Sequence, residues 1–207
     1  MGRIETVLET FNTMYPKAYC ELNHTNALEL LIAVMLSAQS TDISVNKLTK
    51  KLFQKYQSLD DFLTVPTPVL EQDLRQIGLY KNKAKSIKNT CLKIKNEFNG
   101  KVPASQEALE SLPGVGRKTA NVVLSVWYDV PRIAVDTHVE RVSKRLKLAY
   151  NNDTTRKVED KLMRKIPKNL WSKTHHQMIF FGRYHCKSQK PHCEKCPLKE
   201  LCRYPNI

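Results

Sequence analysis

Apolar residues recur at helical spacing along most of the chain, and this periodicity limits the folds that it can adopt. Segment 4–11 places its apolar residues on one face of a helix, and Pro16 ends that run. Segment 27–38 is apolar on nearly every face, which is typical of a helix buried at the centre of a bundle. No strand-like alternation of apolar and polar residues persists anywhere. The sequence therefore predicts an all-α fold.

Capping residues and helix breakers predict where the remaining helices begin and end. Asp42 is expected to cap a helix that runs to about residue 56, and Thr137-x-x-Glu140 is expected to form a capping box for another helix, to about 147. Further helices are predicted over about 82–98, 105–113, 117–128, 158–166 and 171–185, with a loop and a helix start at Pro66 and Pro68.

Length and charge narrow the possible partners. A chain of 207 residues holds one or two modest domains. Its net charge of +14 favours a polyanionic partner, either nucleic acid or an anionic membrane surface. The longest apolar run, Leu30–Leu36, is too short to span a bilayer. Glu5 and Glu9 interrupt the amino-terminal region where a secretory signal would be apolar, so we expect a cytoplasmic protein.

The positive charge is concentrated in segment 81–101, which holds seven lysines and a single acidic residue, Glu97. Such a segment is typical either of a solvated helix face or of a surface that contacts phosphates, and the local sequence favours neither.

Four of the six cysteines gather near the carboxyl end, in the pattern C-x6-C-x2-C-x5-C formed by Cys186, Cys193, Cys196 and Cys202. Because thiols are kept reduced in the cytosol, this cluster indicates a metal site before disulfides. Zinc and an iron-sulfur cluster fit the spacing equally well. The other two, Cys20 and Cys91, are predicted to be buried free thiols. Four histidines lie near the clustered cysteines and are predicted either to pack within the protein or to contact phosphate: 175, 176, 185 and 192.

The stretch LPGVGRKTA, residues 112–120, joins two predicted helices through a Pro-Gly-Val-Gly turn. Glycines allow the backbone N–H groups to approach an anion, and the positive end of the second helix lies behind them. We interpret this hairpin as a site for a DNA phosphate, with a purely structural turn as the alternative.

Two residues near the hairpin are candidates for chemistry. Lys118 lies in the first turn of a helix, where the dipole and Arg117 both disfavour an ammonium, and a neutral amine can attack a sugar carbon and form a Schiff base. The alternative is that Lys118 only contacts a phosphate. Asp136 precedes another helix and could assist such an amine by accepting protons or stabilising positive charge, or could simply cap the helix.

Six stretches taken in order resemble the endonuclease III family, the DNA glycosylases and AP lyases of the helix-hairpin-helix, Gly-Pro-Asp superfamily. They are LSAQSTD (36–42), IGLYKNKA (77–84), LPGVGRKTA (112–120), VDTHVERV (135–142), HHQMIFFGRYHC (175–186) and the cysteine loop (186–202). The resemblance implies a two-domain all-α fold with DNA in the cleft between the domains. Residues 21–130 would form a six-helix barrel with the hairpin at about 106–128, and residues 1–20 and 131–207 would form a discontinuous domain with a structural 4Fe-4S cluster.

The resemblance also implies roles for individual residues. Lys118 would be the nucleophile and Asp136 its essential partner, while Gln39 and Leu79 would fill the gap left by an extruded base. The residues expected to bind DNA are Gln39, Leu79, Gly114, Val115, Gly116, Arg117, Thr119 and His138. The four clustered cysteines would ligate iron, which favours the iron-sulfur interpretation over zinc. From its residues alone, Leu79 could equally be part of the core.

The implied function is base excision repair of duplex DNA by a monomer: removal of oxidised or ring-damaged pyrimidines, then cleavage 3′ to the abasic site by β-elimination. A monofunctional glycosylase of the same superfamily is the nearest alternative, but such enzymes typically lack a lysine at the position of Lys118. A second alternative is a non-enzymatic DNA-binding module in which the cysteine loop holds zinc.

Overall fold

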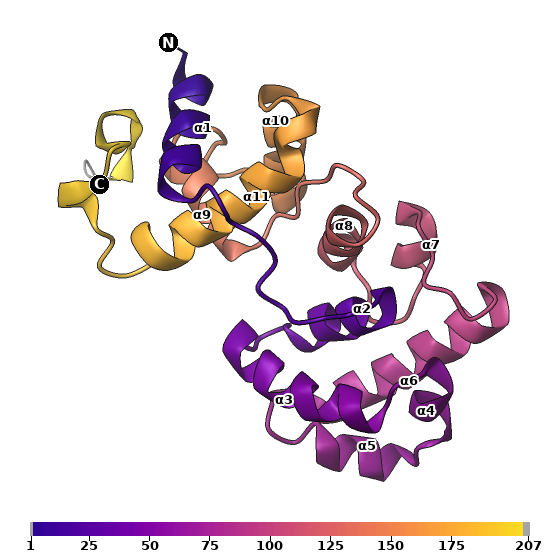
Figure 1. Ribbon diagram of the computed structural model, residues 1–207. Coiled ribbons are helices and arrows are strands. Elements are labelled where there is room, and N and C mark those ends of the chain that lie inside the picture. The colour runs from indigo at the N-terminus through magenta and orange to yellow at the C-terminus, as the bar shows by residue number, and fades with distance from the viewer. Residues whose placement is uncertain (1, 205–207) are drawn as a thin grey trace. The chain divides into compact units, whose positions relative to one another are not determined.

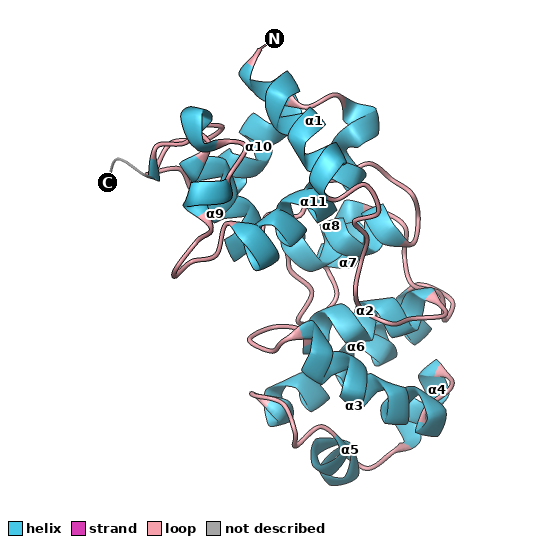
Figure 2. Ribbon diagram, turned by 60° about the vertical axis from the view of Figure 1, so that its left-hand side comes forward, coloured by secondary structure: helices cyan, strands magenta, loops and turns pink. Residues whose placement is uncertain are grey.

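The computed structural model describes residues 2–204, and among these residues the structure is helical, with loops and no strand (Figure 2). The predicted all-α fold is therefore confirmed. The chain divides into two compact units: a central unit, Glu21–Asp129, and a terminal unit formed by the two segments on either side of it. No helix in the described part of the chain is long and apolar enough to cross a membrane.

The central unit is organised around α2, the helix that was predicted to be apolar on nearly every face. All residues from Leu30 to Leu36 are buried, and α2 packs against α3, α6 and α8. The long helix α6 also packs against α4 and α5, and α7 packs against α8 (Figure 1). The helices of this unit are α2 (Ala27–Leu36), α3 (Asp42–Lys55), α4 (Leu59–Thr64), α5 (Thr67–Asp73), α6 (Tyr80–Glu97), α7 (Gln106–Glu110) and α8 (Arg117–Val126).

The terminal unit has its own apolar core, which brings the first helix against the last long one. Phe11 and Phe181 meet there with ring centroids 5.2 Å apart, and both side chains are almost fully buried. Helix α9 packs against both α10 and α11. The elements of this unit are α1 (Arg3–Met14), α9 (Thr137–Arg145), α10 (Thr155–Lys165), η1 (Lys168–Leu170), α11 (Trp171–Phe180), η2 (Phe181–His185), η3 (Cys193–Lys195) and η4 (Lys199–Leu201).

Several predicted helix ends were wrong for local reasons. The N-cap of α3 is Thr41, whose hydroxyl accepts from the Ser44 amide, and not Asp42. The capping box predicted at Thr137 does not form, because Asp136 one residue earlier caps α9 with its carboxylate. The helix expected over 171–185 ends at Phe180 and continues as one π-helical turn, η2. Helix α4, capped by Ser58, was not predicted at all.

The two isolated cysteines differ from each other. Cys91 on α6 is fully buried, as predicted, and burial raises the pKa of its thiol to about 12. Cys20 is only half-buried, because it lies in the loop that follows α1 rather than on the apolar face of a helix.

Candidate functional site

The turn between α7 and α8 depends on two glycines in different ways. Gly114 has a φ of 78°, and a Cβ placed on it would lie 2.9 Å from the Cβ of Ser86. Gly116 has a φ of −95° and is the N-cap of α8, and a Cβ there would meet no protein atom within 4 Å. The first glycine is therefore required by the packing of the hairpin against α6. The second glycine is not required by packing, and the space beside it is open to solvent.

Helix α6 holds the hairpin from behind. The Thr90 hydroxyl donates to the Pro113 carbonyl oxygen at 2.6 Å, and the Lys93 Nζ donates to the Ser111 carbonyl oxygen at 3.0 Å. Val115 is buried against the unit, and its amide donates to the Leu112 carbonyl oxygen at 3.0 Å. These contacts make the turn a supported part of the fold.

The three residues that open α8 were all predicted to belong to the site. Arg117 forms an ion pair with Glu110 across the hairpin, with 3.5 Å between Nη1 and Oε1. Lys118 is exposed, and Thr119 is half-buried. Because Gly116 has no side chain to cap the first turn, the amide N–H groups there lie at an uncapped positive end of the helix dipole.

Asp136 is half-buried and begins α9 in the terminal unit. Its Oδ1 accepts hydrogen bonds from the amides of His138 (2.9 Å) and Val139 (2.8 Å). The structural role considered for this residue, helix capping, is thus real. It also fixes the orientation of the carboxylate, since both bonds reach the same oxygen.

His138 follows Asp136 on α9 and packs tightly against η2. A Cβ on Gly182 would lie 2.8 Å from the His138 Cβ, so only glycine fits there. Burial lowers the pKa of His138, and the Asp136 carboxylate opposes that effect. Arg141 lies beside the ring, with 3.2 Å between its Nη2 and the His138 Nδ1, and donates to the Gly182 carbonyl oxygen at 2.8 Å. Neither Arg141 nor Gly182 was identified from the sequence.

Gln39 and Leu79 share an unusual backbone. Both are non-glycine residues in the left-handed region, with φ values of 56° and 59°. Gln39 is exposed in the loop between α2 and α3, and Leu79 is 51% exposed as the N-cap of α6. The interpretation of Leu79 as a core residue is therefore excluded.

The four clustered cysteines line one cavity together with residues of α9 and η2, among them Arg145 and Phe181. Two of them follow single 3-10 turns directly: Cys196 is the C-cap of η3 and Cys202 that of η4. Burial raises the pKa of the Cys186 and Cys196 thiols, and the other thiols raise it further by Coulombic interaction. The described residues contain no group of three or more His, Cys, Asp or Glu side chains placed to hold a single metal ion.

Donors already point at the sulfur atoms of this cavity. The Arg145 guanidinium is buried on α9 and donates to the Cys186 Sγ at 3.3 Å and to the Lys187 carbonyl oxygen at 2.8 Å. It also lies over the Tyr204 ring, at 3.7 Å from the centroid. The Tyr204 amide donates to the Cys202 Sγ at 3.4 Å. Arg145 was missed from the sequence because nothing local distinguishes it from other helical arginines.

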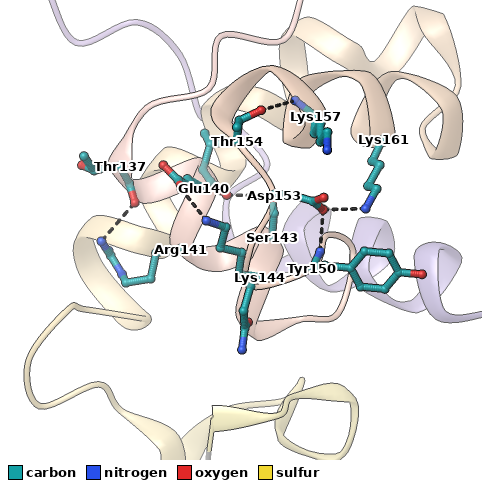
Figure 3. A network of polar contacts seen from close by, with 12 residues as sticks. Thr137, Glu140, Arg141, Ser143, Lys144, Tyr150, Asp153, Thr154, Lys157 and Lys161 are labelled. Atoms are coloured by element: carbon teal, nitrogen blue, oxygen red, sulfur yellow. Dashed lines mark hydrogen bonds and ion pairs between the residues drawn. The ribbon is translucent and has the colours of Figure 1, made fainter.

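Some of the basic residues have structural partners inside the protein. Asp153 is buried and accepts from the Lys161 Nζ at 2.6 Å and from the Tyr150 amide at 2.7 Å, and the Lys161 ammonium lies over the Tyr150 ring (Figure 3). Lys144 pairs with Glu140 one turn earlier on α9 (Figure 3). On α6, Lys83 is buried, so the lysines of this helix do not all lie on one solvated face.

Comparison with known proteins identifies the family. Residues 32–168 match the model of the HhH-GPD superfamily, described as base excision DNA repair proteins. The chain is 56% identical to endonuclease III of Bacillus subtilis (strain 168) over 203 residues, which is 98% of this chain and 93% of that protein. It is 44% identical to endonuclease III of Escherichia coli (strain K12) over 189 residues, covering 91% and 89% of the two chains.

Solved structures agree with this assignment. A trapped covalent intermediate of an endonuclease III with DNA matches with a TM-score of 0.97 and 55% identity, over 100% of this chain and 98% of that one. A thermostable thymine-DNA glycosylase matches with a TM-score of 0.90 and 25% identity, over 99% and 97%. The chain thus belongs to the endonuclease III family, the DNA glycosylases and AP lyases of base excision repair within the HhH-GPD superfamily.

Proposed function

We propose that this protein removes oxidised or ring-damaged pyrimidines from duplex DNA, and cleaves abasic sites, with Lys118 as its nucleophile. The observation that carries the proposal is the position of Lys118: an exposed amine in the first turn of α8, directly after the Gly114–Gly116 turn. A base extruded from the duplex would expose its sugar carbon to such an amine.

The proposed reaction begins when the neutral Lys118 amine attacks C1′ of the damaged nucleotide. The bond between C1′ and the base breaks, and the base leaves with the electron pair and is protonated. Opening of the sugar ring gives a Schiff base between Nζ and C1′, which makes the C2′ proton acidic. Loss of that proton expels the 3′ phosphate by β-elimination, and water then hydrolyses the imine and restores the lysine.

Asp136 is proposed to assist at this centre. Its Oδ1 is engaged by the amides of His138 and Val139, which holds the carboxylate at one orientation. We propose that the same carboxylate accepts the proton that Lys118 must lose, or stabilises the positive charge that develops on the sugar. His138, on the same turn of α9, is proposed to contact the DNA backbone.

The hairpin is proposed to grip a phosphate of the DNA. Gly116 supports this role because neither its backbone angle nor the protein around it requires glycine, and a small residue there lets an anion approach the amides of α8. Val115, Arg117 and Thr119 would complete the contact. Gln39 and Leu79, both exposed, are proposed to occupy the space that the extruded base leaves.

The four cysteines are proposed to hold a 4Fe-4S cluster. Four thiols around one cavity suit a polyatomic cluster with one thiolate on each iron. The donors from Arg145 and the Tyr204 amide support thiolate ligands, since both reach a sulfur atom. The cluster would supply structural cross-linking of residues 186–202, and the proposed reaction at Lys118 requires no redox chemistry.

Borohydride trapping tests the function. Wild-type protein is mixed with a duplex that carries one oxidised pyrimidine or one abasic site, and sodium borohydride reduces any Schiff base to a stable covalent adduct. We expect a trapped complex with wild type and none with Lys118→Ala. Lys101→Ala, at another exposed lysine of the same unit, serves as the matched control and should trap normally. An iron-replete wild type that binds DNA without trapping would overturn the lyase mechanism and favour base release alone.

A further inference from the structure

Lys83 is a buried lysine on the apolar face of α6. It is 6% exposed, and it shares this face with Ile87, Cys91 and Ile94, which follow it at helical spacing and are fully buried. Its ammonium makes three hydrogen bonds to neutral oxygens: the Leu36 carbonyl at 2.9 Å, the Ala38 carbonyl at 2.7 Å and the Ser40 hydroxyl at 3.2 Å. Burial lowers the pKa of Lys83, so keeping a cation there has a free-energy cost.

Those three oxygens belong to the end of α2 and to the loop that follows it. Leu36 is the last residue of α2, and Ala38 and Ser40 stand on either side of Gln39. The Lys83 ammonium therefore lies beneath the Gln39 loop and holds it on both sides. An ammonium also interacts favourably with the negative end of the α2 dipole, where carbonyl oxygens lack partners within the helix.

The backbone of Lys83 reaches the second exposed residue. Its amide donates to the Leu79 carbonyl oxygen at 3.0 Å, one turn earlier on α6. Leu79 and Gln39 both have left-handed backbones, which are unfavourable for residues with a Cβ and persist only where the surroundings hold them. Lys83 is thus bonded to both strained segments at once.

The same helix offers a structural comparison. Lys88, five residues later, also directs its ammonium to three carbonyl oxygens, those of Phe62, Leu63 and Val65 at the end of α4. It is half-buried, and the loop that it contacts contains none of the residues predicted to bind DNA. Lys88 is therefore a control for the contribution that such an ammonium makes to stability alone.

We propose that Lys83 is a positioning residue for base extrusion: its ammonium ties the Gln39 loop to the start of α6, where Leu79 lies, and so holds both side chains in the arrangement that fills the vacated space in the duplex. The inference rests on the proposed function, because it requires these two side chains to enter DNA. Lys83 itself contacts neither the sugar nor Lys118 in this scheme. Its removal should impair extrusion from duplex DNA and leave the chemistry at Lys118 intact.

The test compares Lys83→Met with Lys88→Met, each of which removes an ammonium from three acceptors and keeps a long apolar side chain. Single-turnover cleavage of a duplex abasic site is measured beside cleavage of the same site in a single strand, where no complementary strand is present and there is no gap to fill. A 2-aminopurine opposite the lesion reports by fluorescence whether the gap is filled. Thermal unfolding of each variant measures the stability that each ammonium contributes.

We expect Lys83→Met to slow duplex cleavage roughly tenfold to a hundredfold, as small misplacements of positioning groups do. Cleavage of the single strand and affinity for undamaged duplex should stay near the wild-type values. Lys88→Met should lose stability without this duplex-specific effect. Adding Gln39→Ala should cause little further loss in the Lys83→Met background and a full loss in the Lys88→Met background, because Lys83 acts through the Gln39 loop.

Equal effects of the two lysine variants on duplex cleavage, or effects of Lys83→Met and Gln39→Ala that multiply, would overturn the proposal. If Lys83→Met does not fold, Ser40→Ala decides, since it removes one of the three acceptors and should cause a smaller loss of the same kind. Schiff-base trapping by wild type is independent of these results. It separates failure of this inference from failure of the proposed function.

Discussion

Three glycines, two in the hairpin turn and one after α6, differ in the reason for which a side chain is unfavourable at each position. Gly114 combines a φ of 78° with a Cβ position only 2.9 Å from the Ser86 Cβ. Gly100, after α6, has a similar φ of 72° but no atom within 4 Å of its Cβ position. Gly116 has an ordinary φ and equally open space. Alanine at each position therefore tests backbone strain, steric overlap and ligand approach separately.

The magnitudes follow from these geometries. A left-handed backbone costs an alanine about 1–2 kcal/mol, and the stiffer unfolded chain returns about 0.4–1 kcal/mol of this, so Gly100→Ala should lose roughly 1 kcal/mol. Gly114→Ala adds steric overlap of about 1–3 kcal/mol, because Ser86 Cβ is fixed on α6 and cannot rotate away. The total is about 2–4 kcal/mol, which corresponds to roughly 5–15 °C in Tm for a chain of this size. Gly116→Ala should cost about 1 kcal/mol or less, the usual loss at an N-cap.

Two assays read these variants. Circular dichroism at 222 nm gives the Tm of each variant, and fluorescence anisotropy gives its affinity for a duplex with a non-cleavable abasic analogue. We expect Gly114→Ala to lose the most stability, and Gly116→Ala to weaken DNA binding while its Tm stays close to that of wild type. A Gly114→Ala variant as stable as Gly100→Ala would refute the packing argument. A Gly116→Ala variant with unchanged affinity would refute the approach of a phosphate to α8.

Three further predictions concern the terminal unit. Asp136→Asn should keep the α9 cap through its amide oxygen, so that its Tm changes little while Schiff-base trapping slows about a hundredfold or more. The control, Thr154→Ala, removes the cap of α10 and should lose about 1 kcal/mol of stability but trap normally. Slow trapping by Thr154→Ala would show that loss of a helix cap alone explains the effect. Cys196→Ser should lower the iron content of the purified protein below the roughly four atoms per chain expected for a 4Fe-4S cluster. The control, Cys91→Ser, changes a buried thiol elsewhere and should leave the iron content unchanged. Zinc in place of iron in the wild type would contradict the cluster assignment. Burial lowers the pKa of His176 below 6.5, so the unfolded chain binds more protons than the folded chain as the pH falls through 6.5. The free energy of unfolding should therefore decline in this pH range, and it should decline less in His176→Gln. Equal acid sensitivity of the two proteins in thermal unfolding would count against this prediction.

Much of the fold was predictable because the signals for helices are local. The apolar character of α2 on nearly every face depends only on residues within that segment, and it occurs as predicted. The errors arose where two local signals competed. Thr137 and Asp136 are adjacent candidates for one cap, and the carboxylate of Asp136 reaches two amides at once.

The candidate site was predictable only as a set of residues. The hairpin glycines, Lys118 and the cysteine spacing could be identified from motifs, but the sequence treated Gly114 and Gly116 alike. Their different roles depend on Ser86, which is far away in sequence. Lys83 lay within a lysine-rich stretch with no feature to distinguish it, although its spacing to Ile87 and Cys91 would have placed it on the buried face.

By itself, the sequence determined most of the helices, the order of the motifs and the kinds of chemistry available, since these depend on residue type and on spacing along the chain. Only the tertiary structure decided which of these residues act together. Lys83 lies beneath the Gln39 loop, Arg145 reaches a cysteine sulfur, and Gly182 leaves room for His138. Each of these contacts joins residues more than 40 positions apart, and short-range periodicity carries no information about such pairs.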